Sequence, residues 1–136
     1  MDAISETMRI GASGMAAQSV RLRTVSENVA NAQSTGSSPG ADPYRRKTVS
    51  FETHLDRATG AETVRVKTVG RDMSEFPLEY APSHPAADAR GYVKMPNVNS
   101  VIEMSDMREA SRSYEANVTM VENAKAMLDR TIQMLK

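Results

Sequence analysis

The chain has 136 residues, enough for one modest domain, and its 17 Lys and Arg residues balance its 17 Asp and Glu residues. No segment is basic enough for an electrostatic nucleic-acid footprint, and the absence of Cys excludes disulfides and thiolate metal sites. No stretch approaches the ~20 apolar residues of a membrane span, and the acidic opening residues lack the apolar core of a secretory signal peptide.

Residues 3–32 are predicted to form one long helix. Apolar and small residues recur there in alternating steps of four and three, the spacing of a coiled-coil seam, and the turn-forming residues 33–40 end the helix. Gly11 and Gly14 permit close approach of another helix but weaken an isolated one, which favours ordering on assembly; tolerance of glycine on a surface is the alternative. The predicted seam consists of Ile4, Met8, Gly11, Met15, Gln18, Leu22, Val25, Val29 and Ala32.

Residues 34–97 are predicted to form a small, irregular β-rich segment with several loops. Polar and apolar residues alternate over 63–69, as in a half-exposed strand, and a shorter mixed run covers 44–51. Pro77 restricts the neighbouring alternation over 76–80 to a sheet edge or an irregular extension. Residues 92–95 form a last short extended piece before the chain changes period again.

Residues 100–135 are predicted to form a second long helix. Ser100 and Glu103 have the spacing of a capping box, and Asn99 is a competing N-cap. The predicted seam consists of Met104, Met107, Ser111, Tyr114, Val118, Val121, Lys125, Leu128, Ile132 and Leu135. A second stripe beside it consists of Ala110, Met120, Ala124, Met127 and Met134.

The predicted fold is mainly α, with two long terminal helices packed in coiled-coil fashion in an elongated molecule and a small β-rich insertion. Residues 1–33 and 98–136 would form a terminal-helix domain, and residues 34–97 the middle segment. Helices of ~45 and ~54 Å exceed the ~35 Å diameter of a globule of this size, so other subunits should cover the apolar surface that remains. Methionines recur every seven residues in both helices, either as an adaptable interface or as replacements for Leu. They are Met1, Met8 and Met15, and Met120, Met127 and Met134.

Side chains that could carry catalysis or bind a metal are sparse. Neither His54 nor His84 has a second ligand at metal-binding spacing, and no phosphate-binding loop is present. We therefore expect no enzymatic activity, no cofactor and no metal. The basic cluster Arg45-Arg46-Lys47 is too short for a nucleic-acid site and is expected to line an interface or face solvent.

The first helix carries a recognisable set of motifs. Residues 12–18 read Ala-Ser-Gly-Met-Ala-Ala-Gln, Arg21-Leu22 follows, and residues 26–32 read Ser-Glu-Asn-Val-Ala-Asn-Ala before the turn Thr35-Gly36. This order resembles the N-terminal signature of the flagellar rod and hook axial proteins. In the distal rod and hook members of that family, Tyr followed by Lys or Arg comes directly after the turn.

Three features of this chain are similar to the proximal rod members of the same family. Residues 37–43 intervene between the turn and Tyr44-Arg45, and Gly-Tyr-Val-Lys-Met-Pro-Asn-Val occupies 91–98. The run Ala-Ser-Arg-Ser-Tyr-Glu-Ala-Asn-Val occupies 110–118. The resemblance covers nearly the whole chain.

The resemblance implies a structural subunit of the proximal rod of the flagellar basal body, which crosses the periplasm and transmits torque. Its partners would be copies of itself, related proximal rod proteins, the distal rod protein and the flagellar type III export apparatus. A soluble coiled-coil adaptor or export chaperone is the alternative.

Within the helices, the amides of Asn28 and Asn31 can bind carbonyls of the last helical turn or a neighbouring subunit, or simply mark the helix stop. Tyr114 is expected to be a packed aromatic. The expected assembly-interface residues are Ile4, Met8, Met15, Leu22, Val25, Val29, Asn28, Asn31, Met107, Tyr114, Val118, Val121, Leu128, Ile132 and Leu135.

Overall fold

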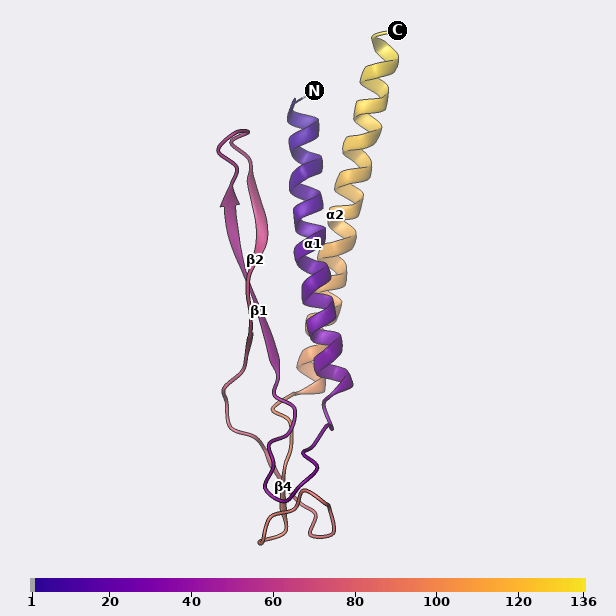
Figure 1. Cartoon of the computed structure of the whole chain (residues 1–136). Coiled ribbons are helices and arrows are strands. Elements are labelled where there is room, and N and C mark those ends of the chain that lie inside the picture. The colour runs from indigo at the N-terminus through magenta and orange to yellow at the C-terminus, as the bar shows by residue number, and fades with distance from the viewer. Residues whose placement is uncertain (1) are drawn as a thin grey trace. The chain divides into compact units, whose positions relative to one another are not determined.

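The computed structural model describes residues 2–136 and has a helix at each end of the chain (Figure 1). In chain order the elements are α1 (Asp2–Ala30), β1 (Lys47–Leu55), β2 (Glu62–Arg71), β3 (Leu78–Tyr80), β4 (Tyr92–Lys94) and α2 (Ser100–Met134). The two packed terminal helices and the small β-rich middle confirm the predicted fold class. Met1, the first member of the N-terminal methionine repeat, lies outside the described residues.

The described chain divides into two compact units, and each contains part of both helices. Unit 1 comprises residues 2–22, 49–68 and 108–136, and unit 2 comprises Arg23–Thr48 and Val69–Met107. None of the helices formed by residues 2–136 is long and apolar enough to cross a membrane.

In unit 1, α1 and α2 pack closely and run antiparallel. A Cβ atom added at Gly11 would lie 2.7 Å from Val121 Cγ2, and one added at Gly14 would lie 2.7 Å from Asn117 Nδ2. Further along α1, the Arg21 guanidinium lies 3.4 Å from the Glu109 carboxylate. Residues later in α1 therefore contact residues earlier in α2, as in any antiparallel pair of helices. The two glycines are needed for this contact because any side chain would displace the residue opposite.

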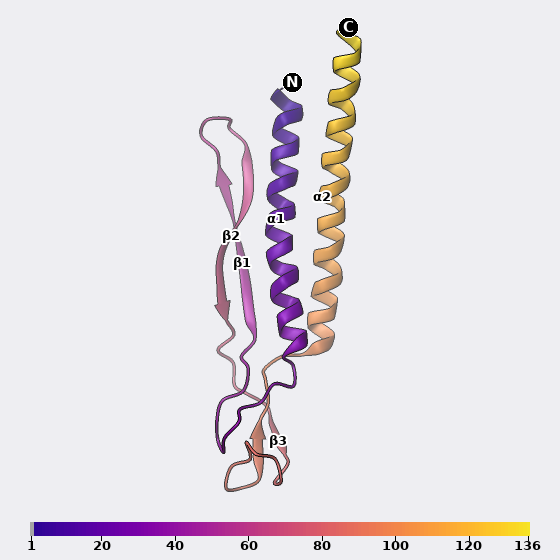
Figure 2. The same cartoon turned by 45° about the vertical axis from the view of Figure 1, so that its right-hand side comes forward.

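The hairpin of β1 and β2 lies on the other side of α1, so that α1 stands between the hairpin and α2 (Figure 2). Arg9 Nη1 donates a hydrogen bond to Asp56 Oδ2 (3.0 Å), and the Val64 backbone N–H donates to Ser13 Oγ (3.3 Å). An isolated two-stranded hairpin is marginally stable in water, so these contacts with α1 help to hold it.

The buried line of α2 lies one position away from the predicted seam. Ala110 and Ala124 are fully buried, whereas Lys125 and Met104 are exposed. The prediction placed the large residues of each heptad at the contact, and that placement is wrong for these positions. Val121, another member of the predicted seam, does face α1, because it is the residue nearest to Gly11.

In unit 2, the start of α2 is capped by Asn99 and not by Ser100. Asn99 Oδ1 accepts hydrogen bonds from the backbone N–H groups of Val101 (3.1 Å) and Ile102 (3.4 Å). The competing cap considered from the sequence is thus the one used. Glu103, the predicted partner of a Ser100 capping box, is completely buried and takes part in a different set of contacts.

The second sheet, also in unit 2, consists of the two short antiparallel strands β3 and β4. Leu78 pairs with Lys94, Glu79 with Val93 and Tyr80 with Tyr92. The Val93 side chain is buried, and the rings of Tyr80 and Tyr92 meet edge to face with centroids 5.4 Å apart. Gly91, at φ 86°, precedes β4 in a left-handed conformation that disfavours any residue with a Cβ atom.

Candidate functional site

Asn28, near the end of α1, is the centre of a polar cluster in unit 2 that we call the polar junction. Its Oδ1 accepts hydrogen bonds from the Tyr44 hydroxyl (2.8 Å) and the Lys47 backbone N–H (2.9 Å). Its Nδ2 donates to the Lys47 carbonyl (2.9 Å) and to Glu103 Oε2 (3.2 Å). The side chain is 1% exposed, and these four bonds use its full hydrogen-bonding capacity.

Arg46 neutralises the buried carboxylate of Glu103. Arg46 Nε donates a hydrogen bond to Glu103 Oε1, and Arg46 Nη1 lies 3.7 Å from Asp72 Oδ2. The hydrogen bond to Glu103 raises the pKa of Arg46, against the opposing effect of burial. A buried carboxylate without a partner is strongly unfavourable, so Arg46 and Asn28 together make this position of α2 tolerable.

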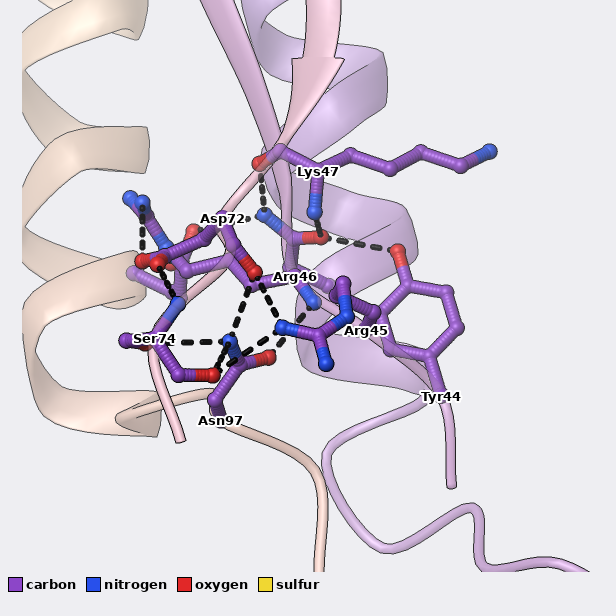
Figure 3. Close-up of polar contacts among 9 residues, drawn as sticks. Tyr44, Arg45, Arg46, Lys47, Asp72, Ser74 and Asn97 are labelled. Atoms are coloured by element: carbon purple, nitrogen blue, oxygen red, sulfur yellow. Dashed lines mark hydrogen bonds and ion pairs between the residues drawn. The ribbon is translucent and has the colours of Figure 1, made fainter. Parts of the chain in front are cut away.

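Residues 44–47 form hydrogen bonds with residues 72–74 and with Asn97 (Figure 3). Arg45 Nη1 donates to the carbonyls of Asp72 (2.7 Å) and Ser74 (3.0 Å), and its guanidinium stacks on the Phe76 ring at 4.1 Å. The Asn97 amide donates to the Asp72 carbonyl (2.9 Å) and accepts from the Arg46 backbone N–H (2.8 Å). The backbone N–H of Ser74 holds the pKa of the Asp72 carboxyl below its ordinary value.

The basic cluster Arg45-Arg46-Lys47 is therefore engaged inside unit 2. Lys47 Nζ lies 2.7 Å from the Glu27 carboxylate, so each of the three basic side chains has a partner in unit 2. The three residues, which were expected to line an interface or face solvent, are half-buried and also have partners within unit 2. Clustered charges in a sequence indicate a surface, but here acidic and carbonyl groups distant in the chain are brought to them.

The hydrogen bonds of the polar junction hold together segments that are distant along the chain. No buried side-chain nitrogen or oxygen atom lacks a hydrogen-bond partner in the part of the chain that the structure describes. Across residues 2–136, three or more His, Cys, Asp or Glu side chains nowhere gather as metal ligands would. His84 lies apart from the junction contacts, where its Nδ1 accepts the Ala86 backbone N–H (3.0 Å), and His54 is exposed.

Comparison with known proteins identifies the class of this chain. Residues 8–36 match the family described as "Flagella basal body rod protein", and residues 89–134 match "Flagellar basal body rod FlgEFG protein C-terminal". The flagellar basal-body rod protein FlgC of Agrobacterium fabrum is 55% identical over 136 residues, which cover 100% of this chain and 98% of that protein.

More distant relatives are similar over almost the same span. The FlgC proteins of Salmonella typhimurium and Bacillus subtilis are 44% and 35% identical. The matches cover 92% of both chains for the first, and 96% of this chain and 97% of the relative for the second. The chain belongs to the FlgC family of flagellar basal-body rod proteins. It is a structural protein of the basal body, as the sequence resemblance implied.

The two matched regions of this FlgC-family chain contain most of α1 and all of α2. Residues 37–88, which include the whole β1–β2 hairpin, lie outside both matches. Most of the matched residues therefore belong to α1 and α2.

The predicted assembly residues fall into three groups by exposure. Val25 and Asn28 are buried, whereas Tyr114, Ile132 and Leu135 are exposed. The Asn31 amide donates to the Glu27 carbonyl (2.9 Å), which is the bond to the last helical turn that was considered for it. The half-buried residues are Ile4, Met8, Met15, Leu22, Val29, Asn31, Met107, Val118, Val121 and Leu128.

Sequence reasoning missed Glu103, Tyr44 and Asn97 as members of the junction. One signal was present. Glu103, Ala110, Asn117 and Ala124 recur every seven residues on α2, and a heptad line with two polar members indicates polar contacts in a helix interface. The partners in segment 44–47 and at Asn97 could not be found this way because no periodicity connects them with α2.

The Tyr44 phenol gives the junction a pH dependence. Burial raises its pKa above the ordinary value, and the charge of Lys47 partly opposes this. Since the folded state holds the proton more tightly, the stabilisation is complete below the unfolded pKa of about 10 and is lost as the pH rises through the folded pKa. We expect the free energy of unfolding to fall more steeply above about pH 10 in the wild type than in Tyr44→Phe. Denaturant titrations across this range measure it, and parallel pH profiles would contradict the assignment.

Proposed function

We propose that this chain assembles with itself and with related rod proteins through α1 and α2, forming the proximal part of the tubular rod that transmits torque. Membership of the FlgC family supports a rod subunit. The helix pair, residues 1–33 and 98–136, would form the axial core, and residues 34–97 an outer layer. Export through the flagellar type III apparatus belongs to the same proposal, and we infer no catalytic role.

The observation that carries this proposal is the length of α2. In unit 1 the contacts of Gly11 with Val121 and of Gly14 with Asn117 set the register, which brings Asp2, the first residue of α1, near Asp129. The end of α2 therefore extends beyond the start of α1 (Figures 1 and 2). Ile132 and Leu135 continue the apolar pattern past this point and are 42% and 80% exposed. An apolar seam on α2 that extends beyond the start of α1 is suited to a contact with another subunit.

Charged substitutions in the helix pair test the assembly proposal. Leu22→Asp and Val121→Asp should each abolish incorporation into the rod, because a carboxylate would be placed in a half-buried apolar contact. The measurement is the amount of subunit in purified basal bodies, together with swimming. Ala89→Asp, at an exposed position outside both helices, is the matched control and should incorporate normally. Normal assembly and swimming of both helix variants would count against the helices as the joint.

A further inference from the structure

Unit 1 has three layers, and both outer layers expose apolar side chains. The hairpin lies on one side of α1 and α2 on the other (Figure 2). On the hairpin, Leu55 is 52% exposed and Val64 39%. On α2, Met127 is 49% exposed and Leu135 80%. Because the hairpin and α2 lie on opposite sides of α1, α2 of one copy can lie beside the hairpin of the next.

A cleft of about 300 Å³ lies on the hairpin side, between the first turns of α1 and the loop that joins β1 to β2. Asp2, Glu6, Arg9 and Thr59 are among its lining residues. The charge of Arg9 is balanced by Asp56, to which it lies at 3.0 Å. The carboxylates of Asp2 and Glu6 therefore give the cleft a net acidic character.

The end of α2 has the complementary chemistry. Among the side chains of residues 130–136, those of Arg130 and Lys136 are basic and none is acidic. Within them Ile132 and Leu135 are exposed apolar residues. This tail cannot enter the cleft of its own chain, because α2 is a continuous helix and α1 stands between it and the hairpin.

We propose that residues 130–136 of one copy dock in the acidic cleft of a second copy, with the basic groups toward Asp2 and Glu6 and the apolar groups against the hairpin loop. The inference rests on the proposed rod function. Donor and acceptor are different surfaces on opposite sides of α1, so the contact is heterologous and repeats with every copy in the same orientation. Such a contact builds a ring or a helix, as a tubular rod requires, whereas an isologous contact would stop at a dimer.

Disulfide trapping tests this contact, and the natural absence of Cys makes the result unambiguous. One cell produces two single-cysteine versions of the chain, Thr59→Cys and Leu135→Cys, and basal bodies are purified under oxidising conditions. We expect a species of twice the subunit mass only when both versions are present, because no chain contains both cysteines. Either version alone should remain monomeric on a denaturing gel. Met73→Cys, at a residue that is 78% exposed in unit 2, replaces Thr59→Cys as the matched control and should give no such species.

Three results would overturn the proposal while leaving the rod function intact. They are incorporation of both versions without the mixed disulfide, a disulfide of Leu135→Cys with its own kind, and trapping only of a partner with a different mass. Absence of the unsubstituted chain from purified basal bodies would instead refute the rod function.

A charge exchange gives a second measurement that does not depend on cysteines. Glu6→Lys should reduce incorporation, and Glu6→Lys combined with Lys136→Glu should restore part of it, because one acid of the cleft and one base of the tail then exchange signs while Asp2 and Arg130 are unchanged. Failure of the second substitution to restore incorporation would count against the contact.

Discussion

Replacing Asn28 by Ala is expected to lower the free energy of unfolding by about 2–4 kcal/mol, a large part of the stability of a small protein. The substitution removes both acceptors and both donors of a side chain that is 1% exposed. It leaves the Lys47 backbone groups and the Tyr44 hydroxyl without their partner, and one oxygen of the buried Glu103 carboxylate as well. Buried polar groups that lose a partner bear the full desolvation cost, which is why the expected effect is large.

Urea unfolding followed by circular dichroism and tyrosine fluorescence measures this effect, since the chain has no Trp. Asn31→Ala is the matched control three residues along the same helix. Its amide is half-buried and donates to one carbonyl of its own helix, so the loss should be within about 1 kcal/mol. Equal losses in the two variants would show that Asn28 acts only through helix propensity and not through the polar junction.

Replacing Gly11 by Leu is expected to separate α1 from α2 in unit 1. The first added carbon would lie 2.7 Å from Val121 Cγ2 and 3.0 Å from Met120 Cε, both inside van der Waals contact. Overpacking of this kind costs about 1–3 kcal/mol, more than the ~1 kcal/mol that Leu gains over Gly in helix propensity. The Gly11→Leu variant should then show a lower unfolding midpoint than the wild type, and it should not be incorporated into the rod.

Two further variants make this prediction specific. Ala12→Leu adds the same bulk at the next residue, which is exposed, and should leave the unfolding midpoint nearly unchanged. Gly11→Leu combined with Val121→Ala removes the side chain that the new Leu would meet and should recover part of the loss. If Gly11→Leu and Ala12→Leu behave alike, close approach of the helices at Gly11 is not required.

Periodicity predicted the helices well because a long helix repeats its environment. The predicted ranges 3–32 and 100–135 differ from α1 (Asp2–Ala30) and α2 (Ser100–Met134) only at their ends. The contact line of α2 was misplaced by one position for a reason that periodicity does not contain. Two adjacent stripes, one through Ala110 and one through Ser111, have the same period, so the period alone does not show which of them α1 covers.

The polar junction shows the same limit more strongly. Asn28 and Arg46 were both singled out from the sequence, one as a helix-end amide and the other as part of a surface cluster. Their partners, Glu103 for both and Asn97 for the segment of Arg46, are more than fifty residues away along the chain. A hydrogen bond is decided by position and direction in space, and residue type alone indicates only that a partner is needed.

The order of residues by itself determined two long terminal helices, a short β-rich middle, a chain without cysteine chemistry, and a resemblance to axial rod proteins. Each of these follows from local pattern: repeat length, turn-forming residues and composition. Only the tertiary structure decided which stripe of α2 faces α1 and that Asn99 caps α2. It also decided that Arg46 balances the buried carboxylate of Glu103 and that the end of α2 extends beyond the start of α1. These contacts form between segments that are distant along the chain. They depend on packing and desolvation among residues that no local sequence pattern connects.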